Sequence, residues 1–140
     1  MVKFVVYGKP VPKARPQFSR MHGKMRTFTP QTTVDFEKLV KEEAKKHFSA
    51  PLEGAVSVYL SFFLPRPQHL IWKTKPMPAI HCDKRPDIDN LAKSVIDGLT
   101  GIAFKDDGQI SSLHLVKRYH AGDKEPRVEI EVTKVVKIYD

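Results

Sequence analysis

The chain has 140 residues, of which 41% are hydrophobic, and this is enough for one domain with a single modest core. It contains no apolar run near the roughly 18 residues of a membrane span and no signal-peptide pattern at Met1, so we expect a cytoplasmic protein without a membrane partner. The formal net charge of +8 favours a polyanionic partner, and nucleic acid is the first to consider, although many basic proteins bind nothing in particular.

The beginning of the chain predicts a strand, a basic loop and a helix. Residues 2–7 are β-branched and aromatic and end before Gly8, which is typical of a strand. Residues 8–29 are expected to form a basic loop. A helix is expected from residue 30 to about residue 48. Its apolar side is formed by Val34, Leu39, Val40 and Ala44.

The middle of the chain predicts a buried strand and then a long irregular segment. Residues 55–64 form an apolar run between Gly54 and Pro65, and we expect this run to be the central strand of a sheet. Residues 65–86 contain five prolines, and a segment of this length without regular structure is usually functional or disordered. In a DNA enzyme this segment would be a mobile binding loop.

The remaining elements complete an α+β order. Apolar residues recur at helical spacing over residues 88–99, and Gly101 suits the C-terminal end of that helix. After a turn, two further strands are expected over residues 109–119 and 127–136. We therefore predict one α+β domain over residues 1–140, in the order β-α-β-α-β-β, with a small mixed sheet flanked by two helices.

Basic segments flank one acidic centre. Residues 1–34 contain seven cations and no acid, and residues 54–82 contain three cations and no acid. Six of the nine aspartates lie between residues 83 and 107, a stretch without glutamate. This distribution favours a bound polyanion more strongly than the net charge alone does.

Asp87 and Asp89 stand at the predicted start of the second helix. One aspartate there is ordinary capping, because its carboxylate accepts a hydrogen bond from a free N–H and suits the positive end of the helix dipole. Capping does not require a second carboxylate two residues later. Both can lie at one end of the helix and share a hard cation, which prefers oxygen ligands.

Asp89, Lys93 and Asp97 recur at every fourth position, so they share the helix face opposite the apolar side. The ordinary interpretation is a solvated row of salt bridges, each worth roughly 0.2–0.5 kcal/mol. If Lys93 instead points at a metal site, its ammonium would stabilise the pentavalent phosphate or position the attacking water.

Asp106, Asp107 and Gly108 have two interpretations. As structure, they form a turn in which aspartate bonds its own backbone and Gly108 supplies a positive φ. As chemistry, they add a third carboxylate at the start of a strand beside the helix. Several carboxylates with a nearby lysine are what metal-dependent phosphodiester hydrolysis requires, because the metal activates water and neutralises phosphate oxygens.

These residues form one extended pattern. It consists of Arg85-Pro86-Asp87-Ile88-Asp89-Asn90-Leu91-Ala92-Lys93, then Asp97-Gly98-Leu99-Thr100, then Asp106-Asp107-Gly108-Gln109-Ile110. The pattern resembles the signature of the RusA family of Holliday-junction resolvases, or crossover junction endodeoxyribonucleases: an Asp-x-Asp-Asn-Leu-x-Lys helix with a downstream Asp-Asp. Gly8-Lys9-Pro10 with Lys13 and Arg15, and the proline-rich segment, are also in the style of that family, so the resemblance covers most of the chain.

The resemblance implies roles for five of these residues. Asp87, Asp89 and Asp107 would be catalytic metal ligands, Lys93 the catalytic lysine and Asp106 an accessory acid that also binds metal. Whether Asp106 or Asp107 is the principal ligand stays open. The resemblance further implies a homodimer that uses Mg²⁺, or alternatively Mn²⁺, to introduce paired nicks across four-way DNA junctions in recombination, repair or phage DNA processing.

Basic residues of the two loops are expected to hold the DNA backbone without recognising its sequence. These residues are Lys13, Arg15, Arg20, Lys24, Arg26, Arg66, Lys73, Lys75, Lys84 and Arg85. Trp72 or Phe18 would be available to stack on unpaired bases, although burial is the commoner fate of a tryptophan.

Two other functions stay open: a non-catalytic protein that binds branched DNA, with the aspartates as caps and turns, and a general flap or branch nuclease. The helix combined with Asp-Asp favours catalysis, because simple binding does not explain it. His81 and Cys82 lack the further spaced ligands of a zinc site. No Walker A or dinucleotide glycine motif occurs, so no nucleotide cofactor is expected. The single cysteine excludes an intrachain disulfide.

Overall fold

A five-stranded mixed sheet forms the centre of the molecule in the computed structural model, which describes residues 1–14, 17–21 and 23–136. The sheet has the strand order β1-β7-β4-β6-β5. Its strands are β1 (Val2–Tyr7), β4 (Val56–Leu64), β5 (Ile80–His81), β6 (Ile110–Tyr119) and β7 (Arg127–Lys134). β4 pairs in parallel with β6 and antiparallel with β7, so the apolar run is the central strand, as the sequence predicts.

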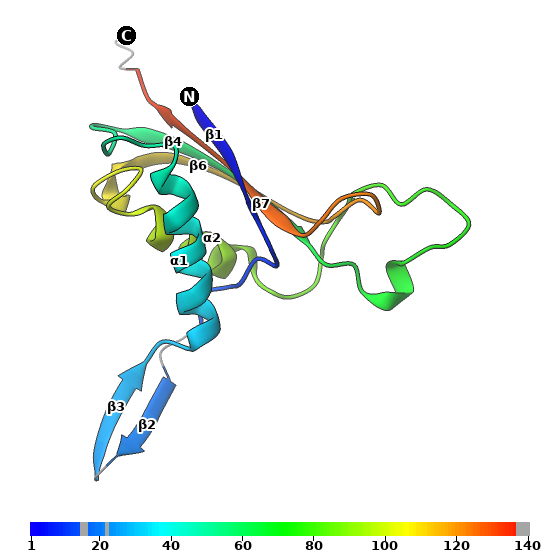
Figure 1. Cartoon of the computed structure of the whole chain (residues 1–140), viewed down its shortest axis with the longest axis horizontal. Coiled ribbons are helices and arrows are strands. Elements are labelled where there is room, and N and C mark those ends of the chain that lie inside the picture. The colour runs from blue at the N-terminus through cyan, green and yellow to red at the C-terminus, as the bar shows by residue number, and fades with distance from the viewer. Residues whose placement is uncertain (15–16, 22, 137–140) are drawn as a thin grey trace.

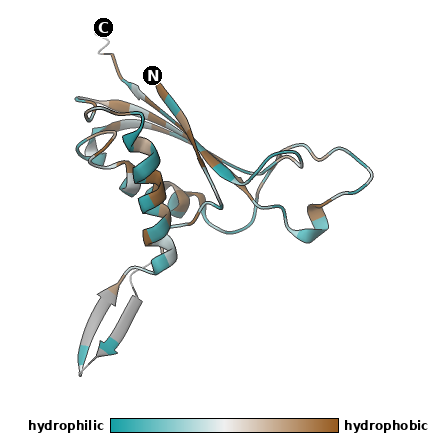
Figure 2. Ribbon diagram, in the orientation of Figure 1, coloured by the Kyte–Doolittle hydropathy of each residue, from teal (hydrophilic) through white to brown (hydrophobic). Residues whose placement is uncertain are grey.

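Two helices, α1 (Gln31–Lys45) and α2 (Ile88–Leu99), cover one face of this sheet (Figure 1). Hydrophobic and hydrophilic residues alternate along the helices and strands (Figure 2), as expected for elements with one buried side. The core combines the buried side chains of β4 with those of both helices, including Leu60, Phe62, Val40, Val95 and Leu99. The predicted α+β class and the order of its main elements are confirmed. None of the described helices is long and apolar enough to cross a membrane.

The two helices approach each other closely at Gly98. A Cβ atom added there would lie 2.9 Å from the Cβ of Val40, so only glycine permits this spacing. The buried side of α1 consists of Thr33, Phe36, Val40 and Ala44. The prediction was therefore right for Val40 and Ala44. It was wrong for Val34 and Leu39, which are 40% and 43% exposed, because the buried stripe follows the spacing that includes Phe36.

The predicted loop over residues 8–29 contains a hairpin, so that part of the prediction was wrong. Its strands are β2 (Gln17–Met21) and β3 (Lys24–Phe28), which pair antiparallel with each other and with no other described strand. Gly23 lies in the turn with φ of 76°. The hairpin projects away from the sheet and the helices (Figure 1). Short strands without a shared core leave little hydrophobic pattern in the sequence.

Residues 65–86 are mostly irregular, as predicted, with a short 3₁₀ helix η1 (Gln68–Leu70) and the two-residue strand β5. The segment folds around Arg66, whose guanidinium donates to the carbonyl oxygens of Leu70, Pro78 and His120 at 2.7, 2.8 and 3.1 Å. These bonds tie the segment to itself and to the connection between β6 and β7. The ring of Trp72 lies near both the Arg66 guanidinium and the Lys75 ammonium, 4.9 and 4.2 Å from its centroid.

Candidate active site

Two exposed carboxylates stand at the start of α2. Asp87 is the N-cap residue, but its side chain makes no capping hydrogen bond. Asp89 follows in the first turn. Both line a cavity of about 680 Å³ together with Lys9, Lys13 and Arg85. Capping therefore does not account for Asp87, which lines a cavity that also contains cationic residues.

Asp89 also lines a second cavity, of about 240 Å³, with Lys93 and Asp107. The other residues of this cavity are apolar and come from α2 and β6: Ala92, Ile96, Leu113 and Leu115. Asp107 reaches the cavity because it lies just before β6, which runs beside α2. Asp89 is thus common to both cavities, with Asp87 in one and Asp107 in the other.

Asp106 and Asp107 have different environments although they are neighbours. Asp107 opens the short 3₁₀ helix η2 (Asp107–Gln109), and Asp106 is its N-cap. The Asp106 carboxylate accepts a hydrogen bond from the Gly108 amide at 3.3 Å, and Gln109 completes a capping box. The structural interpretation of this turn is right for Asp106. The expected positive φ at Gly108 is wrong, because the 3₁₀ turn needs none and the glycines with positive φ are Gly8, Gly23, Gly54 and Gly101.

The predicted metal ligands are not gathered into one cluster. Across residues 1–14, 17–21 and 23–136, no three His, Cys, Asp or Glu side chains lie close enough together to hold a metal ion. Mg²⁺ is commonly held through one or two carboxylates, with water and substrate phosphates completing its shell. The carboxylate pairs at the two cavities fit that mode of binding, and a closed cage of three carboxylates is not formed.

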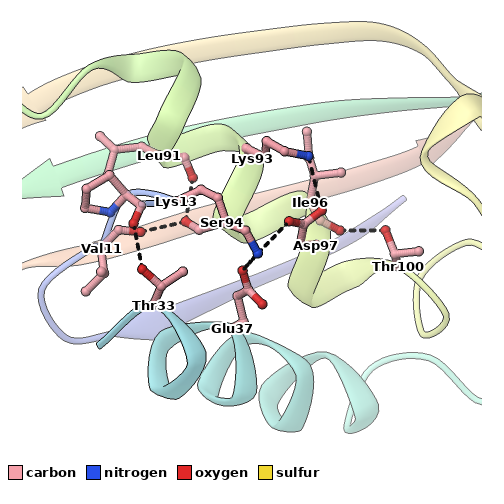
Figure 3. Close-up of polar contacts among 11 residues, drawn as sticks. Val11, Lys13, Thr33, Glu37, Leu91, Lys93, Ser94, Ile96, Asp97 and Thr100 are labelled. Atoms are coloured by element: carbon pink, nitrogen blue, oxygen red, sulfur yellow. Dashed lines mark hydrogen bonds and ion pairs between the residues drawn. The ribbon is translucent and has the colours of Figure 1, made fainter. Parts of the chain in front are cut away.

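Lys93 and Asp97 belong to an ion-pair network that links the two helices (Figure 3). Lys93 Nζ lies 3.7 Å from Asp97 Oδ1. Lys13 Nζ lies 3.2 Å from Asp97 Oδ2 and 2.7 Å from Glu37 Oε1. The hydrogen bond to Glu37, together with Asp97, raises the pKa of Lys13 above its ordinary value although partial burial opposes this. The predicted row on α2 is confirmed for Lys93 and Asp97.

The start of the first loop is fixed on both helices. Ser94 Oγ donates to the Val11 carbonyl at 2.6 Å, and Thr33 Oγ1 donates to the Pro12 carbonyl at 3.1 Å (Figure 3). The Lys13 amide donates to the carbonyl of Asn90 at 2.8 Å. Sequence reasoning missed this anchor. Its signal was the polar Thr33 and Ser94 on otherwise apolar helix sides, where a buried hydroxyl needs a partner.

The predicted DNA-binding cations fall into three groups. Arg20, Lys24, Lys73, Lys75, Lys84 and Arg85 are exposed. Lys13 and Arg66 have partners inside the fold: Lys13 is half-buried in two ion pairs, and Arg66 is 8% exposed and donates to three carbonyls. Arg15 lies outside the described residues, and for Arg26 and Phe18 the description covers only the backbone.

Comparison with known proteins agrees with this arrangement. A family model described as endodeoxyribonuclease RusA matches residues 7–133, which include α2 and Asp107. The chain belongs to the RusA family. It is 31% identical to the uncharacterized protein YqaN of Bacillus subtilis (strain 168), over 96% of each chain. It is 27% identical to the crossover junction endodeoxyribonuclease rusA of Lactococcus phage r1t, over 90% of this chain and 91% of the phage protein. The RusA resemblance seen in the sequence is confirmed.

Proposed function

We propose that this RusA-family protein is a Mg²⁺-dependent endonuclease that resolves four-way DNA junctions by paired phosphodiester hydrolysis. The observation that carries the proposal is the position of Asp89, which faces Asp87 and cationic residues in one cavity and Lys93 and Asp107 in the other. The phage relative is named a crossover junction endodeoxyribonuclease, which supports the choice of substrate.

Each residue of the site has a part in the proposed reaction. Asp89 would provide oxygen ligands for Mg²⁺, or for Mn²⁺ in its place, together with Asp87 at the first cavity and with Asp107 at the second, so the carboxylates act in pairs. The bound ion would activate water and neutralise the phosphate oxygens. The side chain of Lys93 is 60% exposed, and its ammonium lies 3.7 Å from the Asp97 carboxylate, so the ammonium is free to turn toward a phosphate. Asp106 caps η2, so we assign the role of principal ligand in this pair to Asp107.

The cationic residues around the first cavity would bind the DNA backbone of the substrate. Lys9 and Arg85 line the same cavity as Asp87 and Asp89, so a phosphate held by them would lie beside the carboxylates. Exposed cations on the hairpin and on residues 65–86 extend the positive surface. We place the protein in the cytoplasm at the nucleoid, acting as a homodimer in recombination, repair or phage DNA processing.

A cleavage assay with one variant tests the proposal. Labelled four-way junctions, flaps and linear duplexes are incubated with the protein and Mg²⁺ or with a chelator. We expect symmetric nicks in the junction with Mg²⁺ only. Asp89→Asn should abolish these nicks and keep junction binding, because it removes ligand charge and leaves the cations in place. The matched control is Asp123→Asn, an exposed aspartate between β6 and β7, which should cut normally.

Three outcomes would contradict the proposal. Binding of the junction without cleavage at any divalent ion concentration would make the protein a branched-DNA-binding protein. Equal cleavage of flaps and junctions would make it a general branch nuclease. Full activity of Asp89→Asn would remove the assigned site.

A further inference from the structure

Lys117 is a charged residue in an otherwise apolar row of β6. It pairs across the sheet with Phe62 of β4, and its neighbours at every second position are Leu115 and Tyr119, which belong to the core or pack against it. Because side chains alternate along a strand, Lys117 points to the helix side of the sheet. A lysine at such a position needs polar partners, since burying an ammonium without them is costly.

The partners of Lys117 are two backbone carbonyls just before α2. Its ammonium donates to the carbonyl oxygen of Lys84 and, at 2.8 Å, to that of Pro86. These two carbonyls flank Arg85, and Pro86 directly precedes Asp87. The main chain of Lys117 takes part as well, because its carbonyl accepts from the Cys82 amide at 3.1 Å. One residue of β6 thus holds both ends of the segment that leads to Asp87.

The contact of Lys117 with these carbonyls fixes the backbone before Asp87, which no capping hydrogen bond does. Asp87 has no capping hydrogen bond, so its carboxylate direction depends on the backbone that precedes it. Lys117 forms no ion pair within the described residues, and its ammonium donates to the two carbonyls. The backbone of Arg85, an exposed residue that lines the first cavity, lies between these two bonded carbonyls.

We propose that Lys117 is a positioning residue for the cleavage site. It holds the backbone of residues 84–86 so that the Asp87 carboxylate and Arg85 face the same cavity as Asp89. This inference rests on the proposed function. A positioning role differs from a phosphate contact, because replacing Lys117 should then change metal binding even without DNA.

The test compares Lys117→Met, which keeps the side-chain length and removes the ammonium, with the wild-type protein. Mn²⁺ binding is measured by calorimetry without DNA, and cleavage is measured across a Mg²⁺ series. Outer partners that orient metal ligands typically contribute about 10–100-fold in metal affinity or activity, and we expect a loss in that range for both. Junction binding in chelator should be unchanged. Lys117→Arg, which can still donate to both carbonyls, should restore most of the loss.

Arg118→Met is the matched control, because Arg118 is the next residue on β6 and points to the opposite face of the sheet. It should bind Mn²⁺ normally. If Lys117→Met is too unstable to purify, Lys117→Gln takes its place, because it keeps an amide donor and should lose Mn²⁺ affinity to a smaller degree.

Two results would overturn this inference and leave the proposed function standing. In the first, the Lys117 variants bind Mn²⁺ and cleave the junction as the wild-type protein does. In the second, they bind Mn²⁺ normally but bind the junction more weakly and with a lower salt dependence, which is the behaviour of a phosphate contact. If the wild-type protein itself bound no Mn²⁺ and cut no junction, the proposed function would fail, and this inference with it.

Discussion

Asp106 and Asp107 illustrate how adjacent, chemically identical side chains acquire different tasks. The Asp106 carboxylate accepts a hydrogen bond from the Gly108 amide, whereas Asp107 lines the cavity that also contains Asp89 and Lys93. Only the path of the backbone separates the two roles. The sequence left the principal ligand open because both residues fit a turn and both fit a metal site.

The first prediction compares Asp107→Asn with Asp106→Asn. Asparagine caps a helix about as well as aspartate, so Asp106→Asn should keep the η2 turn and most of the cleavage activity. Asp107→Asn removes a charge from the cavity and should lower kcat by at least about 100-fold, a loss of roughly 2.7 kcal/mol of transition-state stabilisation. Single-turnover cleavage of a four-way junction measures both variants. Equal losses would show that the turn, and not one carboxylate, is what matters.

The second prediction concerns Lys93. Lys93→Ala should slow cleavage more than it weakens junction binding, because an ammonium that serves the transition state acts on turnover. Asp97 would still be neutralised by Lys13, at 3.2 Å, so the variant should fold normally. Cleavage rate and junction affinity are measured on the same preparation. A variant that lost only affinity would identify Lys93 as a phosphate contact.

The contact between α1 and α2 positions the site. α2 carries Asp89 and Lys93 on its outer side, and its inner side packs against α1 at Gly98. The Lys13 ion pairs and the Ser94 hydrogen bond hold the first loop across the same pair of helices. The geometry of the cavity therefore depends on how closely these helices approach.

The third prediction is that Gly98→Ala destabilises the protein by about 1–3 kcal/mol, the usual cost of forcing extra atoms into a packed core. The added methyl group would meet Val40 at 2.9 Å, so the helices must separate. Urea unfolding measures the loss. Glu42→Ala, at an exposed position of α1, is the control and should change stability by less than about 0.5 kcal/mol. An unchanged midpoint for Gly98→Ala would mean that the helices are not held at this spacing.

Hydrophobic pattern explains which elements were predictable. The central strand β4 and helix α2 have long apolar repeats, because each is buried over most of its length, and both were predicted within a few residues. The hairpin of β2 and β3 pairs only with itself and has no such repeat. The candidate carboxylates were predictable from their spacing. The sequence did not predict the internal contacts of Lys13, Arg66 and Lys117. A cation that binds carbonyls or carboxylates far along the chain cannot be told from a surface charge in the sequence.

The symmetry of the substrate sets a requirement on how many copies of the chain act together. A four-way junction offers two symmetry-related strands, whereas one chain provides one set of carboxylates. A two-fold dimer would present two such sets at matched positions, as self-complementary assemblies do. The net charge of +8 on each chain would draw two copies to the same junction but would also make them repel each other at low salt.

The fourth prediction is therefore that the free protein sediments as a dimer at working concentration and that junction binding weakens steeply with salt. Each neutralised phosphate contributes a slope of about −0.9 in log affinity against log salt, because counterions are released. Arg85→Gln should reduce that slope by about 1 if Arg85 contacts one phosphate. Lys45→Gln, at the C-terminal end of α1, should leave it unchanged. A monomer would contradict the proposed assembly, because a single chain lacks the second site that paired cleavage requires. Binding that is insensitive to salt would contradict it as well, because phosphate contacts release counterions.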